Sequence, residues 1–256
     1  MQIILAILSF IVGACIGSFL CCQARRLHLK ATKGKKLGNR SVCLKCKTKL
    51  KWYDNIPIVS WLALKGKCRK CGKKIGAGEL ISELLAATSF LLLSFNLNLE
   101  NHYFLITFIL LIINLLFLAI YDGLYGELPT TFLITAIIFA AITALVSQWP
   151  DFPNLIDYLL SVAILGGTYL ALYLVSKGKW VGDGDWLLGV ALGLLLGSPW
   201  LALIALFLSN FLACLVMLPL IKGKNHKIPF GPFLVAATIT ILSFHDFLKY
   251  GIINLW

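Results

Sequence analysis

The stretch "MQIILAILSFIVGACIGSFL", residues 1–20, decides the class of fold, because it is a nearly unbroken apolar run. A helix of about 20 such residues spans the hydrocarbon core of a bilayer. No basic residue precedes the run and no small-residue cleavage site follows it. We therefore expect a retained membrane anchor rather than a signal peptide.

Similar runs recur along the whole chain of 256 residues, of which 59% are hydrophobic and 13% are charged. A soluble domain would carry about 25% charged residues, so the composition excludes a soluble globular protein. The predicted fold is an all-α membrane protein with about eight transmembrane helices. These lie near residues 2–23, 80–97, 103–121, 130–148, 155–175, 186–198, 200–221 and 228–247, and the sixth is short enough to be tilted or partly re-entrant.

The basic residues set the predicted orientation. Of the 23 Lys and Arg, 17 lie between Arg25 and Lys74, and eight spans place every basic residue except Lys249 on one side. By the positive-inside rule that side is the cytoplasm, with both termini outside. The net charge of +12 then comes from basic residues in loops that flank the spans, where they attract anionic lipid head groups. We therefore expect membrane lipid as a partner, and no nucleic acid. The sequence assigns no oligomeric state.

Residues 25–78 form the one sizeable loop, and it contains two CxxC pairs. Cys43 and Cys46 make the first pair and Cys68 and Cys71 the second, with 21 residues between the pairs. This spacing is typical of a structural four-thiolate zinc site, and a loop with so little apolar content needs such a metal to stay folded. Two disulfides are a less favoured interpretation, because the cytoplasm is reducing. A redox motif is also less favoured, because it needs only one CxxC pair. Iron is the alternative metal, since it accepts the same ligands.

Two aspartates stand at the predicted cytoplasmic ends of different spans. Asp122 in "AIYDGLYGELPTT" ends the third span, and Asp185 in "VGDGD" begins the sixth. Ionisable groups at such depth indicate function. Two adjacent carboxyls share one proton, so one activates water while the other donates to a scissile carbonyl. The pair predicts an aspartyl protease, and we expect Gly182 and Gly184 to leave room for an extended substrate.

Two other interpretations of these acids stay open. Both aspartates could cap helices, with Asp185 as the N-cap of the sixth span. A transporter could use the same carboxylates as ion or proton relays, although the chain shows no internal repeat. Asp183 and Glu127 are the nearest further acids, and we expect them to contact substrate. For Asp183 the alternatives are that it tunes the site or, less favoured, that it acts in catalysis itself. For Glu127 the alternative is a solvated loop carboxylate.

Several ordered motifs resemble the type IV prepilin peptidase family. They are "GSFLCCQARRL" at 17–27, the tetracysteine segment with "WYDNIP" at 43–75, "SELLAA" with Glu83, "YDGLYGELP", "GDGD", and "IPFGPFL" at 228–234. The resemblance implies an eight-helix intramembrane aspartyl peptidase of the bacterial plasma membrane, with Asp122 and Asp185 as catalytic residues. It also implies cleavage of prepilins or pseudopilins on the cytoplasmic side, after the glycine that ends a basic leader.

Many members of that family then methylate the new amino terminus with S-adenosylmethionine, and the tetracysteine loop is associated with them. The resemblance divides the chain into a first helix (1–24), a cytoplasmic tetracysteine loop (25–78) and a peptidase core (79–250). "GAGEL" at 76–80 replaces the family's usual Arg-Tyr-Pro, so a peptidase without methylation is the alternative. Because loop and leader are both basic, we expect the loop to lie against anionic lipid and the leader to meet the acids near Asp122 and Asp185.

Overall fold

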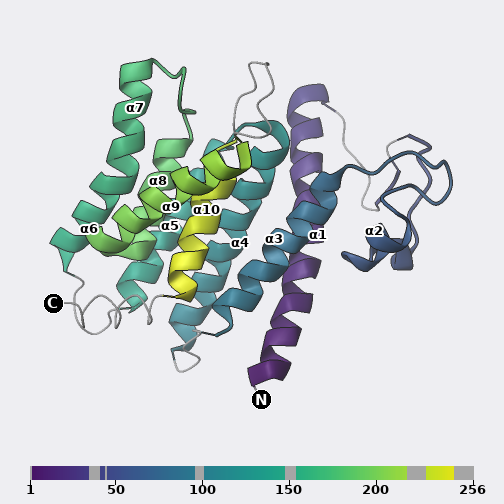
Figure 1. Ribbon diagram of the computed structural model, residues 1–256, viewed down its shortest axis with the longest axis horizontal. Helices are drawn as coiled ribbons and strands as arrows, with labels where there is room; N and C mark the ends of the chain where they lie inside the picture. Colours follow the sequence, from purple (N-terminus) through teal and green to yellow (C-terminus); the bar gives the residue numbers. More distant parts are fainter. Residues whose placement is uncertain are drawn as a thin grey trace. The chain divides into compact units, whose positions relative to one another are not determined.

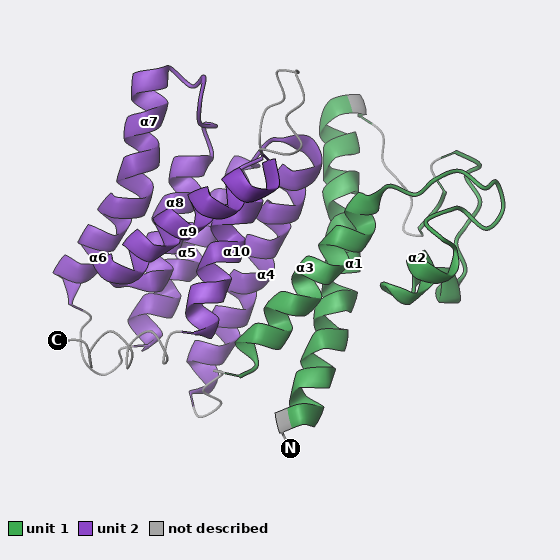
Figure 2. Cartoon of the chain, viewed as in Figure 1, with its two compact units in different colours: residues 1–95 green, residues 96–256 purple. Residues whose placement is uncertain are grey.

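The structure, a computed structural model, is mostly helical (Figure 1). It describes residues 2–34, 41–43, 45–95, 101–147, 154–217 and 229–244. Within these ranges there is no strand, and the cysteine loop has two isolated bridges, Val42 with Lys49 and Lys67 with Lys74. The chain divides into two compact units, Met1–Phe95 and Asn96–Trp256 (Figure 2).

The first unit is built on two long helices, α1 (Gln2–Lys33) and α3 (Ala77–Leu93), packed against each other. A Cβ atom on Gly17 would lie 2.6 Å from the backbone oxygen of Ser82, and one on Gly13 would lie 2.6 Å from that of Ala86. Small residues let two membrane helices approach this closely. The segment between them has two short helices, η1 (Trp52–Asn55) and α2 (Val59–Ala63).

The second unit is a helical bundle, and its longest described helix is α4 (His102–Tyr125). Of the apolar stretch of α4, 56% is buried, against 28% for its neighbour α5 (Thr130–Ser147), so α4 is the more central of the two. The other helices are α6 (Leu155–Val162), a single π turn η2 (Ala163–Gly167), α7 (Thr168–Ser176), α8 (Asp185–Leu196), α9 (Pro199–Met217) and α10 (Gly231–Ser243). In Figure 1, α10 lies among α4, α8 and α9, and it packs against all three.

Close backbone contact holds α8 against α6 and the π turn. A Cβ on Gly193 would lie 2.8 Å from the Cα of Val162, and one on Gly189 would lie 2.9 Å from the carbonyl oxygen of Leu165. The Ser161 hydroxyl donates to the Gly193 carbonyl at 2.8 Å. The position of α8, and of Asp185 at its start, therefore depends on glycines about one and two turns further along the helix.

The prediction of an all-helical membrane protein with a tetracysteine segment after the first helix is confirmed. Within the described residues each predicted span coincides with a helix, and five are long and apolar enough to cross a membrane: Ile3–Thr32, His102–Tyr125, Thr130–Ser147, Leu155–Ser176 and Pro199–Met217. The helices α8 and α10 are apolar but shorter, with 12 and 13 residues, and α3 has 17. Lys249 and residues 218–228 lie outside the described ranges, and the orientation stays a prediction.

We predict that Gly193→Ala lowers the stability of the fold by about 1–3 kcal/mol, because the new methyl group overlaps the backbone of Val162. Gly167→Ala is the matched control, since a Cβ there meets nothing within 4 Å. Thermal unfolding of both purified variants in one detergent measures the difference. A Gly193→Ala variant as stable as the control would show that α6 and α8 do not pack this closely.

Candidate active site

The structure brings the two predicted catalytic aspartates into one region of the second unit. Asp122 lies in the last turn of α4, Asp185 is the first residue of α8, and α5 and α10 each pack against both helices. The two residues are only 5% and 6% exposed, and their carboxyl groups interact electrostatically. Two acids are thus held near each other and almost out of contact with solvent.

Asp122 is bound by the start of α10. Its Oδ2 accepts a 2.8 Å hydrogen bond from the backbone N–H of Gly231, the first residue of that helix. The N-cap residue, Phe230, offers no side-chain acceptor, so the carboxylate satisfies one of the free N–H groups at this helix end. A Cβ on Gly231 would lie 2.9 Å from Oδ2, which explains a glycine at this point of "IPFGPFL".

Asp185 is bound by its own loop. Its Oδ2 accepts a 2.8 Å hydrogen bond from the N–H of Gly182. Gly182 precedes α8, whereas an N-cap side chain bonds to N–H groups inside the helix that it caps. Asp185 therefore does not cap α8 through this contact, and the N-cap position is Gly184.

The expected role of the two glycines in "VGDGD" was wrong for Gly184. A Cβ there would lie 2.6 Å from the Cβ of Leu128 and 3.1 Å from Cδ1 of Leu133. The space beside Gly184 is filled by these two leucines. The glycine therefore lets the loop before α8 pack closely against the segment that follows Asp122. It does not leave room for a substrate.

A buried tyrosine that the sequence analysis did not single out lies beside this site. Tyr169 is 2% exposed, and its ring centroid is 5.4 Å from that of Phe230, the residue before Gly231. Its hydroxyl is 3.4 Å from Ser209 Oγ and accepts from Asn210 Nδ2 at 3.3 Å. It also interacts electrostatically with Asp185. The sequence signal was a polar aromatic residue inside an apolar run. The structure adds the π turn just before Tyr169, a feature frequent at functional sites.

The two acids expected to contact substrate lie at the surface. Asp183 is exposed on the loop before α8, and Glu127 is exposed in the turn after α4. That turn begins at Gly126, which has a φ of 67° and ends the helix in the left-handed conformation. Each exposed acid thus belongs to the same segment as one of the buried aspartates.

The four predicted cysteines converge in the first unit. The Sγ atoms of Cys43, Cys46, Cys68 and Cys71 all lie within 4.8 Å of one another. Those of Cys43 and Cys71 are 3.8 Å apart, which is about the separation of two thiolates on a tetrahedral zinc ion with Zn–S bonds of about 2.3 Å. The cluster can hold a metal ion, and its sulfur ligands and spacing fit zinc.

Each CxxC pair forms the same kind of turn. The Cys43 N–H donates to the Thr48 carbonyl at 3.0 Å, and the Cys68 N–H donates to the Lys73 carbonyl at 2.8 Å. Hydrogen bonds from the side chain and backbone of Thr48 lower the pKa of the Cys46 thiol to about 6. These bonds favour the thiolate of Cys46, which is the form that binds metals.

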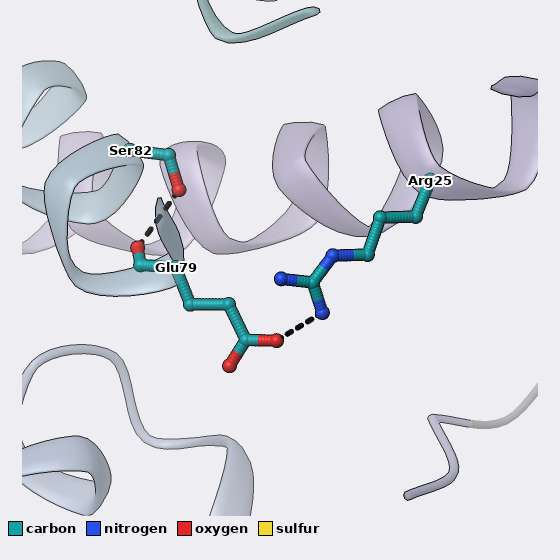
Figure 3. Close-up of polar contacts among 3 residues, drawn as sticks. All are labelled: Arg25, Glu79 and Ser82. Atoms are coloured by element: carbon teal, nitrogen blue, oxygen red, sulfur yellow. Dashed lines mark hydrogen bonds and ion pairs between the residues drawn. The ribbon is translucent and has the colours of Figure 1, made fainter. Parts of the chain in front are cut away.

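Two glutamates of α3 connect the long helices and the loop of the first unit. Arg25 of α1 forms an ion pair with Glu79, whose backbone carbonyl also accepts from Ser82 Oγ at 2.8 Å (Figure 3). Glu83 is 7% exposed and accepts from the Ile58 N–H at 2.6 Å. Neither contact was predicted, although two acids one turn apart on an apolar helix were a signal in the sequence.

Comparisons with known proteins agree with the resemblance in the motifs. A family model described as the Bacterial Peptidase A24 N-terminal domain matches residues 11–97. A prepilin leader peptidase/N-methyltransferase of Bacillus subtilis is 30% identical over 248 residues, which cover 93% of each chain. One of Vibrio cholerae is 30% identical over 211 residues, covering 77% of this chain and 79% of the other.

A prepilin leader peptidase/N-methyltransferase of Myxococcus xanthus is 40% identical over 85 residues, which cover 33% of this chain and 24% of the relative. No solved structure matches. The matches to the Bacillus and Vibrio proteins extend over most of both chains. This chain belongs to the prepilin leader peptidase/N-methyltransferase family.

Proposed function

We propose that this chain removes the leader from prepilins or pilin-like proteins as an aspartic endopeptidase and then methylates the new amino terminus. The names of its relatives support the substrate and both activities. The observation that carries the aspartic mechanism is the pair of nearly fully buried carboxyl groups, Asp122 and Asp185, in one unit. A transporter is not favoured, because the relatives are named as peptidases and methyltransferases.

In the proposed mechanism the two carboxyl groups share one proton, because like charges at close range do not both ionise. The ionised member takes a proton from water, and the water oxygen attacks the scissile carbonyl carbon. The protonated member donates its proton to the carbonyl oxygen. As the C–N bond breaks, the member that took the proton from water passes it to the leaving amine, and the other member regains a proton from the intermediate's hydroxyl as the carbonyl re-forms. Both backbone hydrogen bonds use Oδ2, so each Oδ1 stays available for water or substrate.

We assign a structural zinc ion to Cys43, Cys46, Cys68 and Cys71. Their convergence supports this assignment, because two short CxxC turns with few apolar neighbours hold together best around a shared ion. S-adenosylmethionine would supply the methyl group, and the names of the relatives support this methyl transfer.

The proposed location is the plasma membrane, with many spans, both termini outside and the aspartates facing the cytoplasm. The concentration of basic residues between Arg25 and Lys74 supports this orientation. A basic leader on the cytoplasmic side would then meet the exposed acids Glu127 and Asp183 before it reaches the buried pair. These two residues are the proposed leader contacts.

Asp122→Asn and Asp185→Asn are each expected to lower the rate of leader cleavage by about 10²–10⁴-fold, because each removes one member of the proton-transferring pair. Asp183→Asn should change turnover by no more than a few fold at saturating substrate. Membranes that contain a prepilin-like substrate and each variant are compared by product mass. A wild-type product heavier by one methyl group would show that the chain also methylates the new amino terminus. Full cleavage by either Asp122→Asn or Asp185→Asn would exclude the two aspartates as the catalytic pair.

Gly231→Ala gives an independent test that keeps both carboxylates. The new Cβ would lie 2.9 Å from Asp122 Oδ2, whereas a Cβ on Gly123 would meet only Pro232 Cγ, at 3.5 Å. We expect Gly231→Ala to slow cleavage at least about tenfold by moving the Asp122 carboxylate, and Gly123→Ala to stay near wild type. Equal rates for the two variants would contradict the positioning role of the Gly231 N–H.

Purified wild-type protein is expected to contain one zinc ion per chain, measured by elemental analysis. Cys43→Ser and Cys68→Ser should each lose it, because three thiolates and a hydroxyl hold zinc more weakly than four thiolates. Cys15→Ser and Cys214→Ser are the matched controls, since neither cysteine belongs to the cluster. If the protein contained iron instead, the assignment of zinc would be wrong. If all four variants kept the metal, the four cysteines would not be its ligands.

Glu127→Gln and Asp183→Asn are expected to raise the KM for a substrate with a basic leader by about two- to fivefold, as for exposed ion pairs. Their kcat should change little, and the KM for a substrate with a neutral leader should stay constant. Steady-state cleavage of the two matched substrates measures both constants. An unchanged KM for the basic leader would remove the two acids from substrate recognition.

A further inference from the structure

Four large apolar side chains of the cysteine loop face outward although the loop is folded. Trp52 is 78% exposed, Val59 60%, Leu62 57% and Ile56 39%. The four come from the segment 52–62: Trp52 belongs to η1, Ile56 directly follows η1, and Val59 and Leu62 belong to α2. Exposed apolar groups clustered in this way mark surfaces that are covered in the working protein.

The helix α2 has a second, inward face, so the exposure is not a sign that the loop lacks a core. Trp61 lies between Val59 and Leu62 and packs on Gly66, where a Cβ would be 2.8 Å from Trp61 Cζ2. Trp61 is half-buried, whereas its neighbour Leu62 is exposed. The loop thus buries one apolar face and presents another.

Positive charge borders the outward face. Asp54 is the one acid among the described residues of 41–76, and it accepts from Arg69 Nε at 2.9 Å. Lys51 and Arg69 both lie over the ring of Tyr53, 5.5 Å and 5.1 Å from its centroid. The exposed basic residues of the segment are Lys45, Lys47, Lys49, Lys51, Lys65, Lys67, Arg69, Lys70, Lys73 and Lys74.

A buried acid fixes this face relative to α3. Ile58 has a φ of 62° and a ψ of −54°, and the Val59 N–H donates to the Pro57 carbonyl at 2.5 Å, which makes a γ-turn. This turn is unfavourable for a β-branched residue. The Ile58 N–H is held at 2.6 Å by the Glu83 carboxylate of α3. The outward side chains on either side of Ile58 are therefore tied to a membrane helix of the same unit.

We propose that a surface formed by Trp52, Ile56, Val59 and Leu62 inserts into the membrane. It would enter the interfacial layer of an anionic bilayer. Tryptophan is favoured at this layer, and an apolar face bordered by Lys and Arg has the composition of interfacial membrane anchors. The basic border attracts anionic head groups and repels a basic leader. The loop is joined at both ends to the paired helices α1 and α3, so it meets the bilayer at high effective concentration. The inference does not depend on the aspartyl mechanism.

The test uses the full chain in lipid nanodiscs with an environment-sensitive fluorescent amino acid at position 52, at 62, or at Lys70. Lys70 is the matched control, because it is exposed on the same loop but belongs to the basic border. Quenching by lipids with brominated tails is compared with quenching by aqueous acrylamide. Metal content shows that each labelled loop is folded.

Probes at positions 52 and 62 are expected to be quenched by brominated lipid at least roughly twice as strongly as the probe at 70, and acrylamide should show the reverse order. Phosphatidylglycerol should strengthen the lipid effect relative to phosphatidylcholine alone. In the unmodified chain, hydrogen exchange of the peptide that covers 52–62 should slow in the anionic nanodiscs.

Equal quenching at all three positions, with exchange independent of lipid charge, would overturn the proposal. Protection that appears only after a prepilin is added would also overturn it, because the surface would then belong to the substrate.

Discussion

The burial of carboxylates is the constraint on which both units depend. A charged or hydrogen-bonding group removed from water is destabilising unless the protein supplies a partner. Among the described residues the buried acids are Glu83, Asp122 and Asp185. Each accepts a backbone N–H, from Ile58, Gly231 and Gly182 respectively. No buried acid of this set relies on a lysine or arginine for that bond.

Backbone donors suit these acids for a physical reason. A lysine or arginine beside Asp122 or Asp185 would favour the ionised form of both carboxyls and oppose the sharing of a proton. A backbone N–H holds a carboxyl oxygen in place with a dipole rather than a full charge. It therefore orients the acid and favours the ionised form less than a full positive charge would, so a proton can still be shared between the two acids. The same kind of bond at Glu83 has a mechanical consequence, since it holds the γ-turn of the cysteine loop.

The sequence allowed the helices and the cysteine cluster to be predicted, because both depend on local patterns. Apolar runs gave the spans, and the two CxxC turns place their sulfurs through hydrogen bonds within six residues, such as Cys43 to Thr48. The prediction that Asp122 pairs with Asp185 rested on their shared depth and on the family motifs. Bonds to distant partners could not be predicted: Gly231 is 109 residues from Asp122, and nothing in the sequence marks that contact.

The misjudged role of Gly184 has the same origin. A glycine beside a catalytic residue has the same sequence signature whether its empty side is open to substrate or filled by the protein. At Gly184 the empty side is filled by Leu128, which lies between α4 and α5, and by Leu133 of α5. The conformational freedom of glycine was predictable, whereas the atoms packed against it were not.

The distribution of charge around the aspartates ranks the two proposed leader contacts. Lys177 and Lys179 are exposed on the same loop as Asp183 and partly cancel its attraction for a basic leader. No lysine or arginine occurs between residues 101 and 147, so no basic residue of that stretch offsets the charge of Glu127. Exposed charges act over about one Debye length, roughly 8–10 Å at cellular salt, so nearby lysines matter most. Glu127 should therefore contribute more than Asp183 to recognition of the leader, although Asp183 lies closer in sequence to a buried aspartate.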